Sequence, residues 1–185
     1  MGDLLNKSIV FAAKAHEGQL RKGSEIPYIL HPLEAAAIVA TITTDEEVLS
    51  AAVLHDVIED TPATVKEIRE LFGERVASLV ASESENKRDG QSAADTWQVR
   101  KEETIKHLKS APTDVKIITL GDKLSNIRSM YRDHTLIGDD IWQRFNQKNK
   151  DRHRWYYESI ADCLSELQAY PAYKEYVELV EKTFK

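Results

Sequence analysis

The sequence is poor in the features that mark several common classes of protein. It has 185 residues but only one cysteine, Cys163, so no disulfide can form within the chain and nothing indicates an oxidising compartment. The longest apolar run, residues 35–40, is far too short to span a bilayer, and the N-terminus lacks the apolar stretch of a signal peptide. Lysine and arginine number 25 against 31 aspartates and glutamates, and the net charge of −6 disfavours a nucleic-acid-coating protein. We therefore expect a cytoplasmic protein with neither a membrane nor a nucleic-acid partner.

The residues that are present are those of a soluble, folded protein. The composition is 42% hydrophobic and 30% charged, and the length fits one domain with a sizeable core. Apolar residues recur at intervals of three and four over most of the chain, and no alternating pattern is long enough to predict a strand. We therefore predict an all-α protein with a single domain over residues 1–185. Its core would cover about residues 4–130, and C-terminal helices of about residues 139–185 would pack on that core.

Several helix boundaries can be predicted from capping residues. Thr44 and Glu47 have the spacing of a capping box, which predicts the start of a helix that continues to about Val57. The most apolar helix is expected over residues 115–130, and a polar break is expected to follow it over residues 132–140.

The strongest chemical signal lies at the end of the apolar segment 51–54. His55 and Asp56 follow this segment directly, and Glu59 and Asp60 come one helical turn later. Three carboxylates so close together repel one another unless a cation or a proton holds them. Imidazole and carboxylate ligands together suit Mn²⁺, Fe²⁺ or Zn²⁺. The alternative interpretation is a solvated, charged helix end, which is common in soluble proteins.

Two further residues could join such a site. His31 precedes Pro32 at an expected helix start, although a histidine there often serves only in capping or packing. Asp122 lies in the apolar segment 117–124, where an isolated buried carboxylate would be costly. Lys123 points about 100° away from Asp122 on a helix, so we do not expect it to be the counterion. A salt bridge from Asp122 to another helix is the alternative.

The order of these residues resembles a known family. A histidine, a His-Asp pair and a distant aspartate form the H…HD…D pattern of the HD phosphohydrolase superfamily. The surrounding sequence is more specific and looks like the hydrolase domain of RelA/SpoT-type alarmone enzymes, most similar to the stand-alone small alarmone hydrolases. The segments that carry this resemblance are residues 21–22 (RK), 27–32 (PYILHP), 54–61 (LHDVIEDT) and 121–128 (GDKLSNIR).

The resemblance implies a fold, an activity and a cofactor. The fold would be an HD-domain helical bundle. The reaction would be hydrolysis of the 3′-pyrophosphate of guanosine tetra- or pentaphosphate (ppGpp or pppGpp) to GDP or GTP and pyrophosphate. Glu59 and Asp60 would orient or deprotonate the attacking water and assist the leaving group, and the sequence does not distinguish the base from the acid. One Mn²⁺ ion would be held by His31, His55, Asp56 and Asp122.

The resemblance also implies contacts with a small nucleotide substrate. Arg21 would stack on the guanine base, because a planar guanidinium stacks better than an ammonium, and Lys22 would contact phosphate. Asn126 would lie near the nucleoside, and Arg152 and Tyr156 would meet the far phosphates. The alternatives are a solvated basic turn for the first pair and an ordinary amphipathic helix for the last.

The sequence departs from the family pattern at three places. Gly121 replaces an alanine, which we expect to loosen the helix. Ser125 stands where relatives often carry histidine or tyrosine. Residues 82–96, within which we expect a mobile surface loop, do not match closely, so adenosine alarmones or NADPH remain possible substrates. Further candidates for phosphate contacts around this loop are Lys87, Arg88, Arg100 and Lys101.

Other functions are also compatible with the sequence. A different HD phosphohydrolase, such as a nucleotidase, would release orthophosphate instead of pyrophosphate. A non-catalytic regulator that binds alarmone would have no need for both Glu59 and Asp60. A helical interaction module would leave the ordered ligand pattern unexplained. No particular oligomeric state is predicted.

Overall fold

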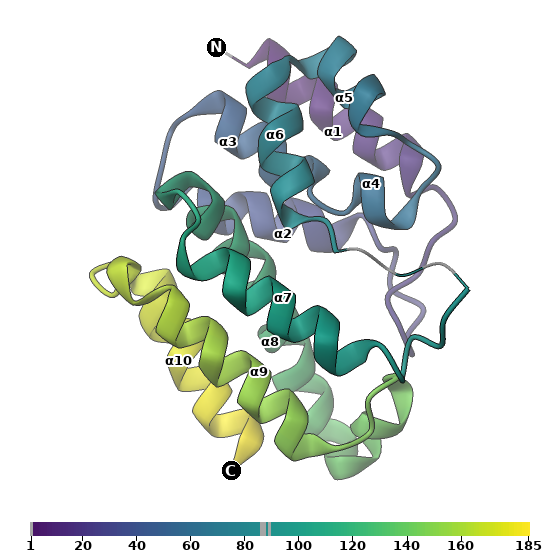
Figure 1. The fold of residues 1–185 in the computed structure, drawn as a ribbon, viewed down its shortest axis with the longest axis vertical. Helices are drawn as coiled ribbons and strands as arrows, with labels where there is room; N and C mark the ends of the chain where they lie inside the picture. The colour runs from purple at the N-terminus through teal and green to yellow at the C-terminus, as the bar shows by residue number, and fades with distance from the viewer. Residues whose placement is uncertain (1, 86–87, 89) are drawn as a thin grey trace. The chain divides into compact units, whose positions relative to one another are not determined.

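The computed structural model describes residues 2–85, 88 and 90–185, and within them all regular elements are helices (Figure 1). The only β-type pairing among these residues is an isolated antiparallel bridge between Leu20 and Pro27. The predicted all-α class is therefore confirmed. The elements are α1 (Asp3–Ala15), α2 (Leu30–Val39), α3 (Glu46–Leu54), α4 (Val57–Asp60), α5 (Val65–Phe72), α6 (Glu74–Glu83), α7 (Trp97–Lys109), α8 (Thr113–Ile137), α9 (Lys150–Cys163), α10 (Pro171–Phe184) and the 3₁₀ helices η1 (Gly138–Arg144) and η2 (Ser165–Leu167).

The chain forms two compact units. The first unit comprises the chain up to Ser84 together with Thr113–Ser125, and the second comprises Glu85–Pro112 and Asn126–Lys185. The prediction of a single domain stays a prediction. No helix in the described part of the chain is both long enough and apolar enough to cross a membrane.

The first unit is built around α3. This helix packs against α1, α2 and α6, and α5 packs against α6. Ala51, Ala52 and Leu54 are fully buried, which explains why α3 is apolar on every side in its second half. The core therefore reaches to the residue immediately before the His55-Asp56 pair.

The start and the end of α3 both differ from the prediction. Asp45, and not Thr44, is the N-cap: its Oδ1 accepts hydrogen bonds from the backbone N–H groups of Glu47 (3.0 Å) and Val48 (3.4 Å). Asp and Thr are both good N-caps, so a cap assigned from spacing alone can be displaced by one residue. The helix also ends at Leu54 and does not reach Val57; a turn separates it from α4.

The polar break predicted over residues 132–140 is wrong up to residue 137. α8 continues through these residues and ends at Gly138, whose φ of 60° is in the left-handed region. The polar side chains of this last part are largely solvated or paired on the helix surface; Asp133, for example, forms a 3.0 Å ion pair with Arg144 of η1. Polarity there reflects exposure to water and not the end of a helix.

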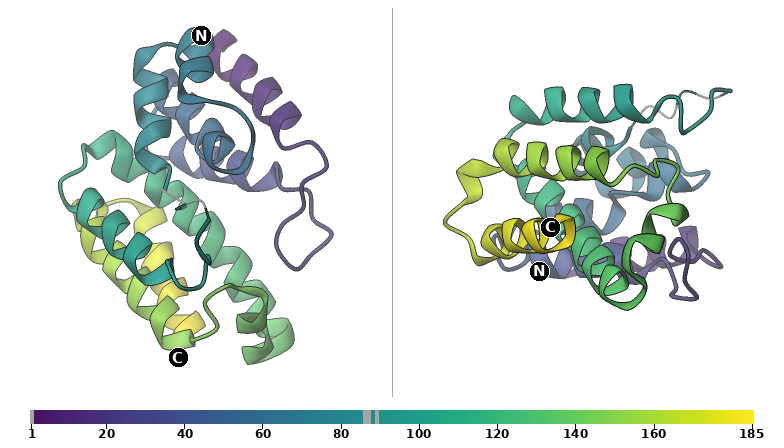
Figure 2. Two further views of the ribbon diagram at one scale, coloured as in Figure 1. Left: turned by 45° about the vertical axis from the view of Figure 1, so that its right-hand side comes forward. Right: turned by 90° about the horizontal axis from the view of Figure 1, so that it is seen from below.

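The second unit contains a hairpin of α9 and α10, which η2 connects and which lie side by side in Figures 1 and 2. α7 packs on α9. Tyr176 of α10 is fully buried and donates a 2.9 Å hydrogen bond to the backbone oxygen of Tyr157 of α9. Pro171 begins α10 at its first turn, where its missing N–H costs no helical hydrogen bond.

Candidate metal centre

Three buried side chains of the first unit converge although they are far apart in sequence. The donor atoms of His31, His55 and Asp122 all lie within 4.8 Å of one another. Asp122 Oδ1 is 3.2 Å from His31 Nε2 and 3.7 Å from His55 Nε2. These side chains come from the first turn of α2, from the residue after α3 and from the middle of α8. Three of the four predicted ligands therefore form a compact, buried group.

Asp56, the fourth predicted ligand, lies against the same group. Its Oδ2 is 3.1 Å from His55 Nε2 and 3.4 Å from His31 Nε2. The turn between α3 and α4 allows His55 and Asp56 to face the same point, although they are adjacent in sequence. The structure thus brings all four predicted ligands together.

The two imidazoles are oriented by hydrogen bonds on their outer nitrogens. His55 Nδ1 is 2.8 Å from the backbone oxygen of Ala52, which can only accept, so Nδ1 carries a hydrogen and Nε2 is the nitrogen that faces the carboxylates. His31 Nδ1 is 2.8 Å from Ser125 Oγ. Among the described residues, the buried His55 Nε2 has no partner with hydrogen-bond geometry. A buried imidazole nitrogen that faces the carboxylates of Asp56 and Asp122 belongs to a donor set that fits a divalent cation, which would take the place of a proton on that nitrogen.

The charges of these four side chains also fit a site that holds a cation. Burial opposes charge on His55, but the Asp56 and Asp122 carboxylates outweigh it and hold the pKa of His55 well above its usual value. Burial also opposes charge on Asp56, but His55 and His31 keep its pKa well below the usual range. The pKa of Asp122 is likewise held low against burial, by Lys123 and the two histidines. Ionised carboxylates in a buried site require positive charge, which a proton or a metal can supply.

Lys123 is a counterion of Asp122, contrary to the expectation from helical geometry. Its Nζ lies 2.5 Å from Asp122 Oδ2. The helix does direct the two Cβ atoms apart, but the flexible four-carbon stem of lysine lets the ammonium group reach back to its neighbour. One oxygen of Asp122 thus faces Lys123, and the other, Oδ1, faces the histidines.

Tyr28 contacts the site, although it was not among the residues predicted to form it. Its hydroxyl donates to Asp56 Oδ2 at 2.6 Å and lies 3.1 Å from Asp60 Oδ2. Its ring also meets the His31 ring edge-to-face, with centroids 5.8 Å apart. The position of Tyr28 three residues before His31, in the stiff segment that opens α2, is the sequence signal that could have identified it.

The two candidate catalytic carboxylates are carried by α4. The backbone N–H of Asp60 donates a 2.9 Å hydrogen bond to the backbone oxygen of Asp56, so the two residues lie one helical turn apart as expected. The Gln19 amide donates to the Asp60 backbone oxygen at 2.8 Å, which ties α4 to the loop before α2. Asp60 is exposed and Glu59 is partly exposed, so both are accessible from solvent. Their catalytic roles stay predictions.

The loop before α2 brings one of the two predicted basic residues toward the site. The guanidinium carbon of Arg21 lies 5.7 Å from the centroid of the Tyr28 ring, within the range of a cation–π contact. The backbone N–H of Arg21 donates to Ile26 at 2.8 Å and closes the loop. Lys22 is exposed on the same loop.

The remaining predicted substrate contacts, Asn126, Arg152 and Tyr156, belong to the second unit, and their contact with the substrate stays a prediction. Asn126 begins the part of α8 that belongs to this unit. Arg152 is exposed in the first turn of α9. Tyr156 is only 3% exposed, and the ammonium of Lys101 lies 4.8 Å from the centroid of its ring.

The other basic candidates are paired with carboxylates where the structure describes them. Glu85 pairs with Arg100 at 3.0 Å and with Lys101 at 2.6 Å. Arg88 pairs with Glu103 at 2.5 Å, and Lys87 lies outside the described residues. Arg88, Arg100 and Lys101 are therefore less available for phosphate than their charge suggests.

Gly121 has a packing role that differs from the expected loosening of the helix. A Cβ atom at this position would lie 2.7 Å from the backbone oxygen of Ala35 and 2.7 Å from Val39 Cγ2. The absence of a side chain on α8 therefore permits close approach of α2, the helix that carries His31.

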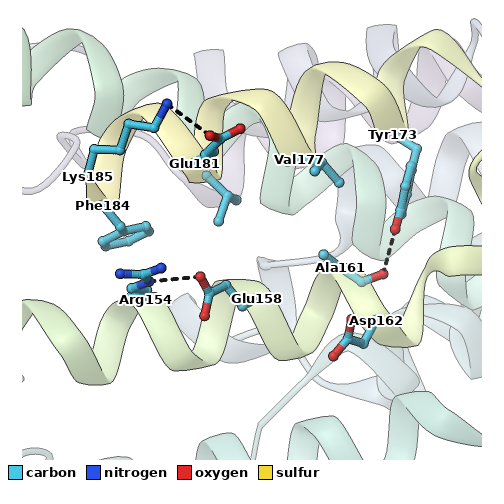
Figure 3. A pocket seen from close by; sticks show the side chains of 10 residues that line it. Arg154, Glu158, Ala161, Asp162, Tyr173, Val177, Glu181, Phe184 and Lys185 are labelled. Atoms are coloured by element: carbon cyan, nitrogen blue, oxygen red, sulfur yellow. Dashed lines mark hydrogen bonds and ion pairs between the residues drawn. The ribbon is translucent and has the colours of Figure 1, made fainter.

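A separate groove lies between α9 and α10 and has a volume of about 620 Å³ (Figure 3). Four of the five charged side chains that line it form two ion pairs: Arg154 with Glu158 at 2.8 Å and Lys185 with Glu181 at 2.9 Å. None of the residues that line it is a predicted ligand or catalytic residue. The groove therefore adds nothing to the candidate metal centre.

Comparison with known proteins identifies relatives that are similar in sequence to much of this chain. The chain is 38% identical over 131 residues to a GTP pyrophosphokinase of Myxococcus xanthus and 41% identical over 128 residues to the bifunctional (p)ppGpp synthase/hydrolase SpoT of Escherichia coli K12. These matches cover 69% and 68% of this chain but only 17% and 18% of the relatives, so the chain spans less than a fifth of their length.

Solved structures match over much more of their length. The structure of a metazoan ortholog of SpoT, which hydrolyses ppGpp and plays a role in starvation responses, has a TM-score of 0.81 and 28% identity. The match covers 98% of this chain and 96% of the other. The protein lmo0812 of Listeria monocytogenes has a TM-score of 0.73 and 34% identity, over 83% of this chain and 98% of the other. The HD domain model matches residues 8–149, which contain His31, His55, Asp56 and Asp122, and the chain belongs to the HD domain family.

Proposed function

We propose that this protein is an alarmone hydrolase, which converts ppGpp or pppGpp and water to GDP or GTP and pyrophosphate. The observation that carries the proposal is the buried group of His31, His55 and Asp122 with Asp56 against it, from three separate parts of the chain. The near full-length similarity to a metazoan SpoT ortholog that hydrolyses ppGpp supports the same substrate.

We propose that the resident cation is Mn²⁺. The mixture of two imidazoles and two carboxylates supports a metal of this kind. The buried Nε2 of His55, which has no partner of hydrogen-bond geometry in the described part of the chain, supports a cation over a structural hydrogen bond. When bound, such a cation lowers the pKa of a bound water and offsets the charge that builds on the attacked phosphorus. Lys123 would balance the second oxygen of Asp122, which leaves the first for the cation.

In this proposal Glu59 and Asp60 carry out the proton transfers of the reaction. Both carboxylates are accessible from solvent, and the Tyr28 hydroxyl contacts both Asp60 and Asp56. Between them they would orient and deprotonate the attacking water and assist departure of pyrophosphate. A positioned acid or base of this type contributes roughly a factor of 10²–10⁴ in rate.

The basic loop before α2 would hold the nucleotide. Arg21 already lies over an aromatic ring, and its planar guanidinium would stack on guanine in the same manner. Lys22 would contact phosphate. Asn126, Arg152 and Tyr156 would contribute the further contacts with the nucleoside and the far phosphates.

The test is incubation of the purified chain with ppGpp, with either Mn²⁺ or a chelator present. We expect GDP and pyrophosphate to appear only with Mn²⁺, and not with the Asp122→Asn variant. Asp114→Asn is the matched control, because Asp114 lies on the same helix but pairs at the surface with Arg75. Release of orthophosphate would indicate a nucleotidase, and no turnover by folded protein would contradict the proposed activity. Binding of ppGpp without turnover would indicate a regulator.

A further inference from the structure

The hydrogen bond that orients His31 continues to a second side chain. His31 Nδ1 lies 2.8 Å from Ser125 Oγ, and the Ser125 hydroxyl donates to Glu34 Oε2 at 2.8 Å. His31 is 3% exposed and Ser125 is 1% exposed, so water does not compete at this bond. The three side chains thus form a continuous path that ends in a carboxylate.

The direction of the hydrogen bonds along this path is determined by its end. The Ser125 hydroxyl donates to Glu34 Oε2, so the single hydroxyl hydrogen of Ser125 is used toward Glu34. The serine oxygen then presents a lone pair to His31, and Nδ1 of His31 must be the donor. This leaves the lone pair on Nε2, the nitrogen that lies 3.4 Å from Asp56 and 3.2 Å from Asp122.

We propose that Ser125 and Glu34 are positioning residues that fix His31 in the tautomer and orientation needed to bind a divalent cation through Nε2. At His55 the backbone oxygen of Ala52 performs the same task directly. His31 lies in the first turn of its helix, so a partner from another helix supplies the acceptor instead. This inference rests on the proposed metal site.

The helical register supports a dedicated arrangement. Glu34 lies three residues after His31 on α2, and Ser125 lies three residues after Asp122 on α8, so each helix presents one candidate ligand and one supporting side chain on the same face. Serine is short, and Gly121 permits the close approach of α2 and α8 that a hydroxyl of this length needs to reach both partners.

The test is the affinity for Mn²⁺, measured by titration calorimetry on chelator-treated protein. We expect Ser125→Ala to weaken binding by roughly 10- to 100-fold, the usual effect of removing an outer partner of a ligating histidine. Ser125→Thr keeps the hydroxyl and should bind within about threefold of the wild type. Glu34→Gln keeps an acceptor but loses the charge and should lie between them. Ser129→Ala, one turn later on α8, is the control and should leave the affinity unchanged.

The possible outcomes distinguish the positioning role of Ser125 and Glu34 from the metal site itself. Wild-type affinity in both Ser125→Ala and Glu34→Gln would overturn the positioning role while leaving the metal site intact. Equal weakening in Ser125→Ala and Ser125→Thr, with Glu34→Gln unaffected, would also overturn it, because loss of packing and not of the hydroxyl would then be responsible. Absence of Mn²⁺ binding in the wild type would instead contradict the proposed metal site itself.

Discussion

The Tyr28 hydroxyl donates a 2.6 Å hydrogen bond to Asp56 Oδ2, and the same hydroxyl lies 3.1 Å from Asp60 Oδ2. One phenol therefore contacts both a candidate metal ligand and a candidate catalytic carboxylate. Burial and the neighbouring Asp56 carboxylate hold the pKa of Tyr28 well above its usual value, so the hydroxyl stays protonated and remains a donor. It has one hydrogen for two acceptors, and the shorter distance assigns that hydrogen to Asp56.

Tyr28→Phe removes this donor and keeps the ring. A hydrogen bond to a charged group contributes about 1.5–3 kcal/mol, so kcat should fall by roughly tenfold to a hundredfold. The measurement is the rate of pyrophosphate release at saturating Mn²⁺ and ppGpp. Tyr170→Phe, an exposed tyrosine of the second unit, is the control. A wild-type rate for Tyr28→Phe would show that Asp56 and Asp60 do not depend on this contact.

Asp60→Asn separates catalysis from metal binding. The Asp60 carboxyl is exposed and is not one of the side chains within the buried cluster, so Mn²⁺ affinity should be preserved. Turnover should fall by roughly a factor of 10² or more, because an amide cannot take a proton from water. Calorimetry and single-turnover hydrolysis on the same preparation measure the two quantities. Near-normal turnover would remove Asp60 from the mechanism.

Gly121→Ala should have two opposing effects on the stability of the protein. Alanine favours a helix over glycine by about 1 kcal/mol, but its Cβ would lie 2.7 Å from the Ala35 backbone oxygen. Overpacking of this kind costs about 1–3 kcal/mol, and backbone cannot rotate away as a side chain can. We expect lower stability in urea and weaker Mn²⁺ binding, because a displaced α2 moves His31 away from Asp122. An increase of about 1 kcal/mol in the free energy of unfolding would contradict this expectation, because helix propensity alone would then determine the stability of the variant.

Glu83 should make stability depend on pH. Burial and the nearby Asp122 carboxylate raise its pKa to about 7, against the opposing effects of Lys123 and of a 2.8 Å hydrogen bond from Thr119. An unfolded glutamate titrates near pH 4.3, so the folded state binds this proton more tightly. The associated stability is complete below the unfolded pKa and is lost as the pH rises through about 7.

The Glu83→Gln variant stays neutral at every pH and tests this dependence. Its free energy of unfolding should rise relative to the wild type between pH 5 and pH 8, by at most about 3 kcal/mol. Urea denaturation in the presence of chelator is the measurement, and Glu70→Gln, at an exposed ion pair of α5, is the control. A difference between Glu83→Gln and the wild type that does not change with pH would contradict the assignment.

Much of the fold was accessible from the sequence because helices are local structures. Apolar spacing predicted that the chain is helical and located the most apolar helix, and the errors fall at boundaries. Thr44 and Asp45 are neighbours with similar capping ability, and the polar residues 132–137 continue α8 because their side chains are solvated on its surface. Such patterns report exposure and propensity well, but they locate the last residue of a helix poorly.

The sequence alone determined the all-α class, because helical periodicity belongs to the residues themselves. Its resemblance to the HD phosphohydrolases supplied the four side chains that are predicted to hold a cation. Only the tertiary structure decided how these side chains are supported. The Tyr28 hydroxyl on Asp56 and the path from His31 through Ser125 to Glu34 join segments far apart in the chain. The Lys123 ammonium reaches its neighbour Asp122 only through the rotamer that the folded structure selects. The spacing of residues in the sequence does not predict those distances, because they follow from how closely the helices pack.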